Sequence, residues 1–172
     1  MHHDLTDLAQ SLGRRMAEQC TDGLPGHFGE ELLEQFADED SRSIGIALAE
    51  LEAEGLVTLT HVIGPHLPRV RTTVELFVAC DPAITGHDPV EDSVVLARML
   101  IADPKIGGRA SDLEQAAGWE RRRFNPAFAL VIPNIGDGRV RKSIQNEYPT
   151  LGVLIADEDV VQLRRYIQWS SR

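Results

Sequence analysis

The chain has 172 residues, of which 42% are hydrophobic and 26% charged, and its formal net charge is −10. This length suits one domain or two small ones, and the apolar content excludes a disordered chain. The charge disfavours simple attraction to phosphate, while the lack of a long apolar run and of a signal-peptide pattern predicts a cytoplasmic protein without membrane spans.

The first half of the chain reads as three helices followed by a pair of strands. Apolar residues recur at helical spacing and then alternate with polar ones, as half-buried strands require. Asp38 to Ser41 forms a turn, and Ser41 or Ser43 is the expected N-cap of the third helix, which ends at Gly55. A turn with Pro65 and Pro68 joins the strands. The expected helices are residues 5–18, 28–37 and 44–55, and the expected strands are 57–63 and 70–79.

A short segment rich in Pro and Gly, residues 81–89, separates the two halves, and the second half repeats the pattern. After a helix at 90–102, Ser111 is the expected N-cap of a short helix, with Glu114 completing a capping box. Asn125 before Pro126 predicts another helix start, and Asp157 is the expected cap of the last helix. Between these two helices, strands are expected at 138–144 and 151–156, joined by a turn at 146–150.

The order of helix, helix, helix and hairpin resembles the winged helix superfamily. The stretch from Ala47 to Val57, ALAELEAEGLV, is similar to the end of the recognition helix in many bacterial regulators. The resemblance implies a mainly α fold with small β-hairpins (α+β), formed by two tandem winged helix-turn-helix modules. These would span residues 1–81 and 89–172, with a linker at 82–88. Such modules bind DNA, RNA or other proteins, so the fold alone does not select a function.

Charge is distributed unevenly along the chain. Residues 1–88 contain 5 Lys and Arg against 16 Asp and Glu, a net of −11, whereas residues 89–172 contain 12 against 11, a net of +1. The third helix has Arg42 but also Glu50 and Glu52 among its outward residues. Because glutamates repel phosphate, the first module is poorly suited to the major groove, and the second is the better candidate for a polyanion.

Basic residues gather in two segments of the second half. A run of three arginines precedes the expected helix start at Asn125, and the first strand of the second hairpin contains three more cations. Strand alternation sends Arg139 and Arg141 to one face, which is the geometry of a phosphate clamp. The expected nucleic-acid-binding residues are Arg121, Arg122, Arg123, Arg139, Arg141 and Lys142, extended by Arg109, with weaker help from Arg42, Arg69 and Arg71.

Two functions are compatible with these patterns. The first is a DNA-binding protein, a transcriptional regulator that acts as a homodimer on double-stranded DNA. The second is an acidic tandem winged helix adaptor, whose first module binds a basic protein partner in a larger assembly, for example a chromosome-organising one. In the second case the arginines balance nearby carboxylates, such as Glu120, Asp137 and Glu147, or contact a protein.

Nothing in the sequence predicts catalysis, a cofactor or a metal site. No nucleophile is paired with a base, no nucleotide-binding loop is present, and Gly107-Gly108 is interpreted only as a loop. Cys20 and Cys80 are interpreted as inert thiols, and the six histidines follow no metal-binding pattern. Of the aromatic residues, Trp119 and Phe124 are expected in local packing, and Tyr148 at a wing tip, where it could touch DNA or a partner.

Overall fold

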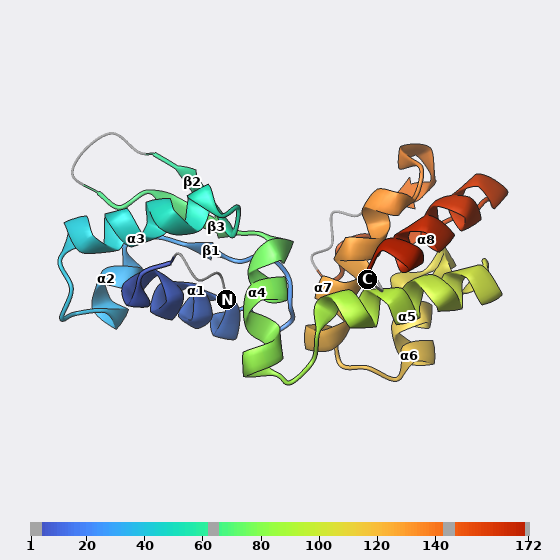
Figure 1. Ribbon diagram of the computed structural model, residues 1–172, viewed down its shortest axis with the longest axis horizontal. Coiled ribbons are helices and arrows are strands. Elements are labelled where there is room, and N and C mark those ends of the chain that lie inside the picture. The colour runs from blue at the N-terminus through green and yellow to red at the C-terminus, as the bar shows by residue number, and fades with distance from the viewer. Residues whose placement is uncertain (1–4, 62–65, 143–146, 171–172) are drawn as a thin grey trace. The chain divides into compact units, whose positions relative to one another are not determined.

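The computed structural model describes residues 5–61, 66–142 and 147–170, and it is mainly helical with two small antiparallel sheets (Figure 1). It divides into two compact units. The first unit comprises the chain up to Thr21 and residues 25–84, and the second comprises residues 22–24 and the chain from Thr85 onward. Part of each predicted hairpin turn, including Pro65 and Asn146, lies outside the described residues.

The first unit packs helices against a three-stranded sheet of order β1-β3-β2, in which both pairs of strands are antiparallel. Helix α1 contacts both α3 and α4, and their facing side chains form a continuous apolar core. The elements are α1 (Asp7–Gln19), β1 (His27–Phe28), α2 (Glu31–Gln35), α3 (Ser41–Ala53), β2 (Val57–Thr60), β3 (Arg69–Thr72) and α4 (Val74–Ile84).

Local capping fixes the ends of the first unit's long helices. The Thr6 side chain accepts a hydrogen bond from Ala9 N and starts α1. The carboxylate of Asp40 accepts one from Ser43 N at 2.8 Å, so the expectation that a serine caps α3 was wrong. A carboxylate is the stronger acceptor for free amides at a helix start, and the pKa of Asp40 is lowered accordingly by its hydrogen bond to the Ser43 backbone. Gly55, at a φ of 71°, follows the end of α3 as predicted.

Two segments of the first unit differ from the expectation. The predicted second helix does not begin at Phe28, because Phe28 lies in β1 and pairs with Val70 of β3. The predicted returning strand ends at Thr72 instead of continuing to residue 79. From Val74 the chain is helical, because one face of α4 buries its side chains in the core next to α1. Burial of a helical face outweighs the local preference of an alternating β-branched segment.

The second unit is a small helical bundle with a short hairpin. Helix α5 packs against both α7 and α8, and the buried side chains of Phe124, Phe128 and Leu163 lie in the shared core. The elements are α5 (Pro89–Ala102), η1 (Ile106–Gly108), α6 (Ala110–Ala117), α7 (Arg121–Val131), η2 (Ile132–Asn134), η3 (Asp137–Arg139), β4 (Val140–Arg141), β5 (Gly152–Val153) and α8 (Asp157–Ser170).

Three helix boundaries differ from the expectation, namely the end of α4 in the first unit and the starts of α6 and α7 in the second. Helix α4 continues through Pro82 to Ile84, so the connection to α5 is shorter than the predicted linker at 82–88. Helix α6 has Arg109 at its N-cap position without a side-chain hydrogen bond, so Ser111 is not the cap. Helix α7 starts at Arg121 and encloses Pro126. Burial of the face that contains Phe124 outweighs the cost of a proline inside the helix.

No helix within the described ranges has both the length and the apolar character needed to cross a bilayer.

Candidate anion-binding site

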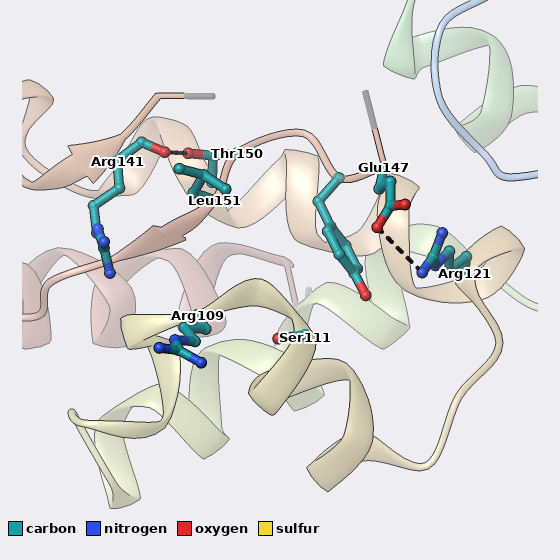
Figure 2. A pocket seen from close by; sticks show the side chains of 8 residues that line it. Arg109, Ser111, Arg121, Arg141, Glu147, Thr150 and Leu151 are labelled. Carbon is teal, nitrogen blue, oxygen red and sulfur yellow. Dashed lines mark hydrogen bonds and ion pairs between the residues drawn. The ribbon is translucent and has the colours of Figure 1, made fainter. Parts of the chain in front are cut away.

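A cavity of about 340 Å³ opens on the second unit where the starts of α6 and α7 meet the hairpin. Three of the predicted cations, which come from three separate segments of the chain, line this cavity together (Figure 2). Arg109 and Arg141 lie on one side of the view, and Arg121 lies beside Glu147 on the other. The full lining consists of Arg109, Ser111, Arg121, Arg141, Glu147, Tyr148, Thr150 and Leu151.

A close approach of two backbone segments forms this site. Ala110 N donates a hydrogen bond to Leu151 O at 2.7 Å, which holds the start of α6 against the hairpin. A Cβ atom at Gly152 would lie 2.5 Å from Gly108 O, so only glycine fits there. Gly107-Gly108 is therefore part of the site's framework, which the interpretation as a simple loop missed. The sequence shows these glycines, the pair Gly107-Gly108 and Gly152 in the second hairpin, but only the fold brings them into contact.

Two guanidinium groups at the cavity make no ion pair with any residue that the structure describes. Arg141 donates from Nη1 to Gly108 O at 2.7 Å, which orients the side chain, and its guanidinium makes no other hydrogen bond to the residues that the structure describes. Arg109 is exposed at the start of α6. An arginine fork is well matched to phosphate or carboxylate oxygens, so these two residues give the cavity its capacity to bind an anion.

The third cation of the cavity is fixed in place by its neighbours. Arg121 lies 3.4 Å from a Glu147 carboxylate oxygen and 3.9 Å from one of Glu114. Its guanidinium carbon is 5.1 Å from the centre of the Tyr148 ring. The Tyr148 hydroxyl donates to Glu114, and burial, followed by this hydrogen bond, raises the pKa of Tyr148 above its ordinary value. Tyr148 thus forms a wall of the cavity, packed edge-on against Phe124, and does not project from a tip.

Arg139 does not belong to this site, and the predicted common face with Arg141 was wrong. Arg139 lies in η3, one residue before β4, and its side chain contacts α8, whereas that of Arg141 lines the cavity. It pairs with Asp159 at 2.6 Å and with Glu158 at 2.9 Å. These carboxylates raise the pKa of Arg139, the Asp159 hydrogen bond contributing most. The side chain lines a separate hollow together with Gly136.

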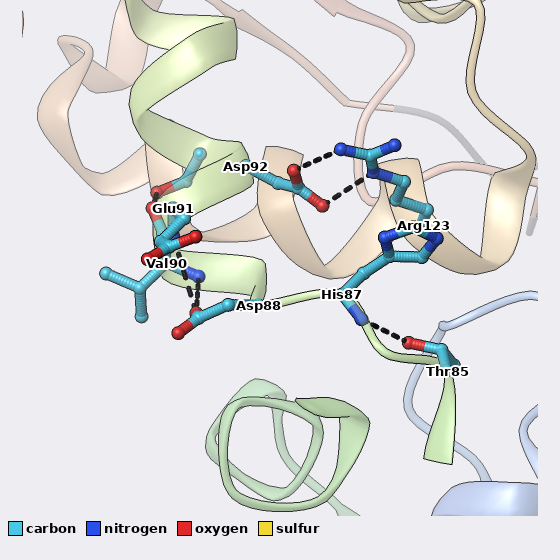
Figure 3. Close-up of polar contacts among 8 residues, drawn as sticks. Thr85, His87, Asp88, Val90, Glu91, Asp92 and Arg123 are labelled. Atoms are coloured by element: carbon cyan, nitrogen blue, oxygen red, sulfur yellow. Dashed lines mark hydrogen bonds and ion pairs between the residues drawn. The ribbon is translucent and has the colours of Figure 1, made fainter. Parts of the chain in front are cut away.

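Arg123 is also engaged by a carboxylate. It donates to both oxygens of Asp92, from Nε at 2.8 Å and from Nη2 at 2.6 Å (Figure 3). Its guanidinium carbon lies 4.2 Å from the centre of the Trp119 ring. Both contacts join α7 to neighbouring segments, so Arg123 stabilises the unit and is not available as a phosphate clamp.

The run of three arginines therefore diverges. Successive residues of a helix point about 100° apart, so three neighbouring side chains cannot share one surface. Arg122 lines a further hollow with His87 and Trp119, separate from the cavity that contains Arg121.

The remaining predicted cations are exposed. Lys142 directly follows β4 in the second unit. Arg69 and Arg71 alternate along β3 with buried residues, as predicted, and Arg42 lies in the first turn of α3. These last three arginines belong to the first unit.

Within residues 5–61, 66–142 and 147–170, no group of three or more His, Cys, Asp or Glu side chains is arranged to hold a metal ion. Cys20 and Cys80 are both free and buried. Comparisons of the chain with protein-family models, with curated proteins and with solved structures found no match.

Proposed function

We propose that the protein binds double-stranded DNA through the second unit, and that the cavity-lining arginines make the main phosphate contacts. One observation supports this proposal above the others: Arg109, Arg121 and Arg141 come together from three segments of the chain at one cavity. Lys142 is a further exposed cation of the second unit, directly after β4. Phosphate contacts of this kind supply most of the affinity of DNA-binding proteins.

We further propose that each unit is a winged helix module. In the first unit, this is supported by the order of α1, α2 and α3 followed by the strand pair β2 and β3. In the second unit, it is supported by the order of α5, α6 and α7 followed by β4 and β5. In such a module the second and third helices and the hairpin form one surface, and the cavity arginines lie on these elements.

A double variant tests the DNA proposal. Replacing Arg109 and Arg141 with alanine removes two phosphate contacts, so the slope of log affinity against log salt should fall by about 2 and the affinity by about tenfold or more at low salt. Fluorescence anisotropy of a short labelled duplex, measured over a series of salt concentrations, gives both quantities.

The matched control changes two arginines away from the cavity. Arg164 and Arg165 are exposed on α8, so their double alanine variant has the same net charge as the test variant. We expect the control to retain the wild-type salt slope within experimental error. Equal losses in the two variants would mean that only net charge matters, and the assignment of the cavity would then be wrong.

A role in transcription as a homodimer is part of the same proposal. Two copies would place two phosphate-binding cavities on neighbouring half-sites of one duplex, which multiplies affinity. Sedimentation velocity of the protein with a duplex tests this: two chains on one duplex are expected, and a single bound chain at saturation would contradict the dimer.

A second candidate function is supported by the first unit. Outward positions of α3 are apolar at its centre: Ile46 is 55% exposed, and Ala49 lies one turn further along the helix. Neither side chain can form hydrogen bonds with the edges of DNA bases, and an exposed isoleucine favours contact with a protein.

The alternative function is that of an adaptor whose acidic first unit binds a basic protein. Under this alternative, a stoichiometric partner without retained nucleic acid should be captured by the wild type but not by Ile46→Asp.

A further inference from the structure

The three arginines of the second unit line a cavity, but binding to the phosphates of a DNA duplex does not require a cavity. Contacts to a DNA phosphate need donors on an exposed surface, because the phosphates lie on the outside of the duplex. A volume of about 340 Å³ instead falls in the range of sites that enclose small molecules. The cavity is therefore large enough to admit a small molecule.

The charges around the cavity favour a dianionic occupant. Its lining has three guanidinium groups and one carboxylate, that of Glu147, which gives a net charge of +2. Glu114 is not among the lining residues; it accepts a hydrogen bond from the Tyr148 hydroxyl and lies 3.9 Å from Arg121. A phosphomonoester carries between one and two negative charges at neutral pH and has three acceptor oxygens, which several arginine donors can bind at once.

The donors available to such a group lie at one end of the cavity. Ser111 and Thr150 are already engaged, since Ser111 Oγ donates to Asp112 and Thr150 Oγ1 donates to Arg141 O. Arg109 and Arg141, in contrast, make no ion pair within the described part of the chain. Recognition of an anion therefore depends on these two guanidinium groups.

The remaining walls of the cavity suit the organic part of a ligand. Leu151 is 40% exposed beside the cavity, and the ring of Tyr148 forms part of the lining. An apolar and an aromatic wall next to a few charged donors is the usual composition of a small-molecule site.

We infer that the cavity binds a small organic phosphomonoester, with its phosphate at Arg109 and Arg141 and its carbon body against Leu151 and Tyr148. Because the same two arginines contact DNA in the proposed function, the bound phosphomonoester excludes DNA from the second unit. The exclusion rests on the proposed function, whereas the small-molecule site does not.

Isothermal titration calorimetry of the full chain with ribose 5-phosphate, inorganic phosphate and ribose tests the site. Ribose 5-phosphate is expected to bind more tightly than inorganic phosphate, and ribose is expected not to bind. Arg109→Ala and Arg141→Ala should each weaken the binding of ribose 5-phosphate by about tenfold or more, the usual loss for a charge-assisted hydrogen bond. Arg141→Lys keeps the charge but loses the two parallel N–H donors of the guanidinium, so this variant should also weaken binding. The control Arg164→Ala should not.

The outcomes separate the two proposals. If ribose 5-phosphate does not bind, or binds equally well to Arg109→Ala, Arg141→Ala and wild type, the small-molecule site is wrong, whatever the protein does with DNA. If it binds through these arginines and the wild type binds no duplex, the DNA function is wrong and the site stands. If both ligands bind but ribose 5-phosphate does not displace the labelled duplex, the exclusion is wrong. Circular dichroism of each variant confirms that the fold is retained.

Discussion

Replacing Asp159 with alanine is expected to lower the free energy of unfolding of the second unit by about 3 kcal/mol, the cost of leaving buried donors without a partner. The Asp159 side chain is 2% exposed and lies against Arg139. Its carboxylate also accepts hydrogen bonds from Gly136 N at 3.0 Å and Ala156 N at 2.9 Å. One side chain therefore joins the start of α8 to the segment that leads into β4.

The matched control for this variant is Glu158→Ala. Glu158 is the neighbouring residue and also pairs with Arg139, but its side chain is 68% exposed. An exposed ion pair contributes about 0–1 kcal/mol, so this change should have little effect on the denaturation midpoint. Urea denaturation followed by circular dichroism measures both variants. Equal, small effects in the two would show that the buried carboxylate does not hold the hairpin to α8.

Asp159 should also make the stability of the second unit depend on pH. Burial raises the pKa of the Asp159 carboxyl, but its hydrogen bonds from Arg139, Ala156 and Gly136 outweigh burial, and the pKa lies below the ordinary value of 3.8. Because the pKa is lower in the folded state, the stabilisation is fully present above pH 3.8 and is lost as the pH falls through the folded-state pKa. The Asp159→Asn variant should therefore lose less stability than wild type between neutral pH and the acid range.

The second large effect is expected at Gly152. An added Cβ atom would lie 2.5 Å from Gly108 O and 2.8 Å from Gly107 O, and backbone oxygens cannot move aside as a flexible side chain can. Gly152→Ala should therefore destabilise the second unit by about 2–3 kcal/mol, as overpacking does at close contacts. Thermal unfolding measures this effect. Gly138→Ala is the control, because a Cβ atom there would have no neighbour within 4 Å.

Gly152→Ala should also weaken ligand binding without removing any cation. The contact of Gly152 with Gly107-Gly108 places Arg109 beside the hairpin strand that contains Arg141. If η1 and β5 move apart, the two guanidinium groups no longer face one ligand. Reduced affinity for ribose 5-phosphate and DNA in the variant that still folds is the expected result, and wild-type affinity for both would contradict this account of the site's framework.

Helices with strong local signals were predicted well from the sequence. The predicted helix at 90–102 corresponds to α5, which starts at Pro89 behind the side-chain cap of Asp88. Apolar spacing likewise located α1 and α8. At α8, however, Asp157 is the first residue of the helix, and the carboxylate that bonds the helix start is that of Asp159. Periodicity locates an element, whereas its cap depends on which side chain reaches the free amides.

The residues that line the cavity were identified in part from the sequence, because the types of side chain were clear but their partners were not. Arg123 pairs with Asp92, 31 residues away, and Arg139 pairs with Asp159, 20 residues away. No local rule connects residues at such separations. The sequence therefore identified the basic residues of the second half, but only the fold separated those that bind carboxylates from Arg109 and Arg141.

What the sequence determined by itself is the mainly helical character of the chain, the presence of a strand pair in each half and the uneven distribution of its charge, because these follow from periodicity and composition. The tertiary structure decided that residues from Val74 form a helix, that Pro126 lies inside one, and that three distant arginines line one cavity. The physical reason is that burial and close backbone approach join segments far apart in the chain, and their free energies exceed the small local preferences that a sequence pattern reports.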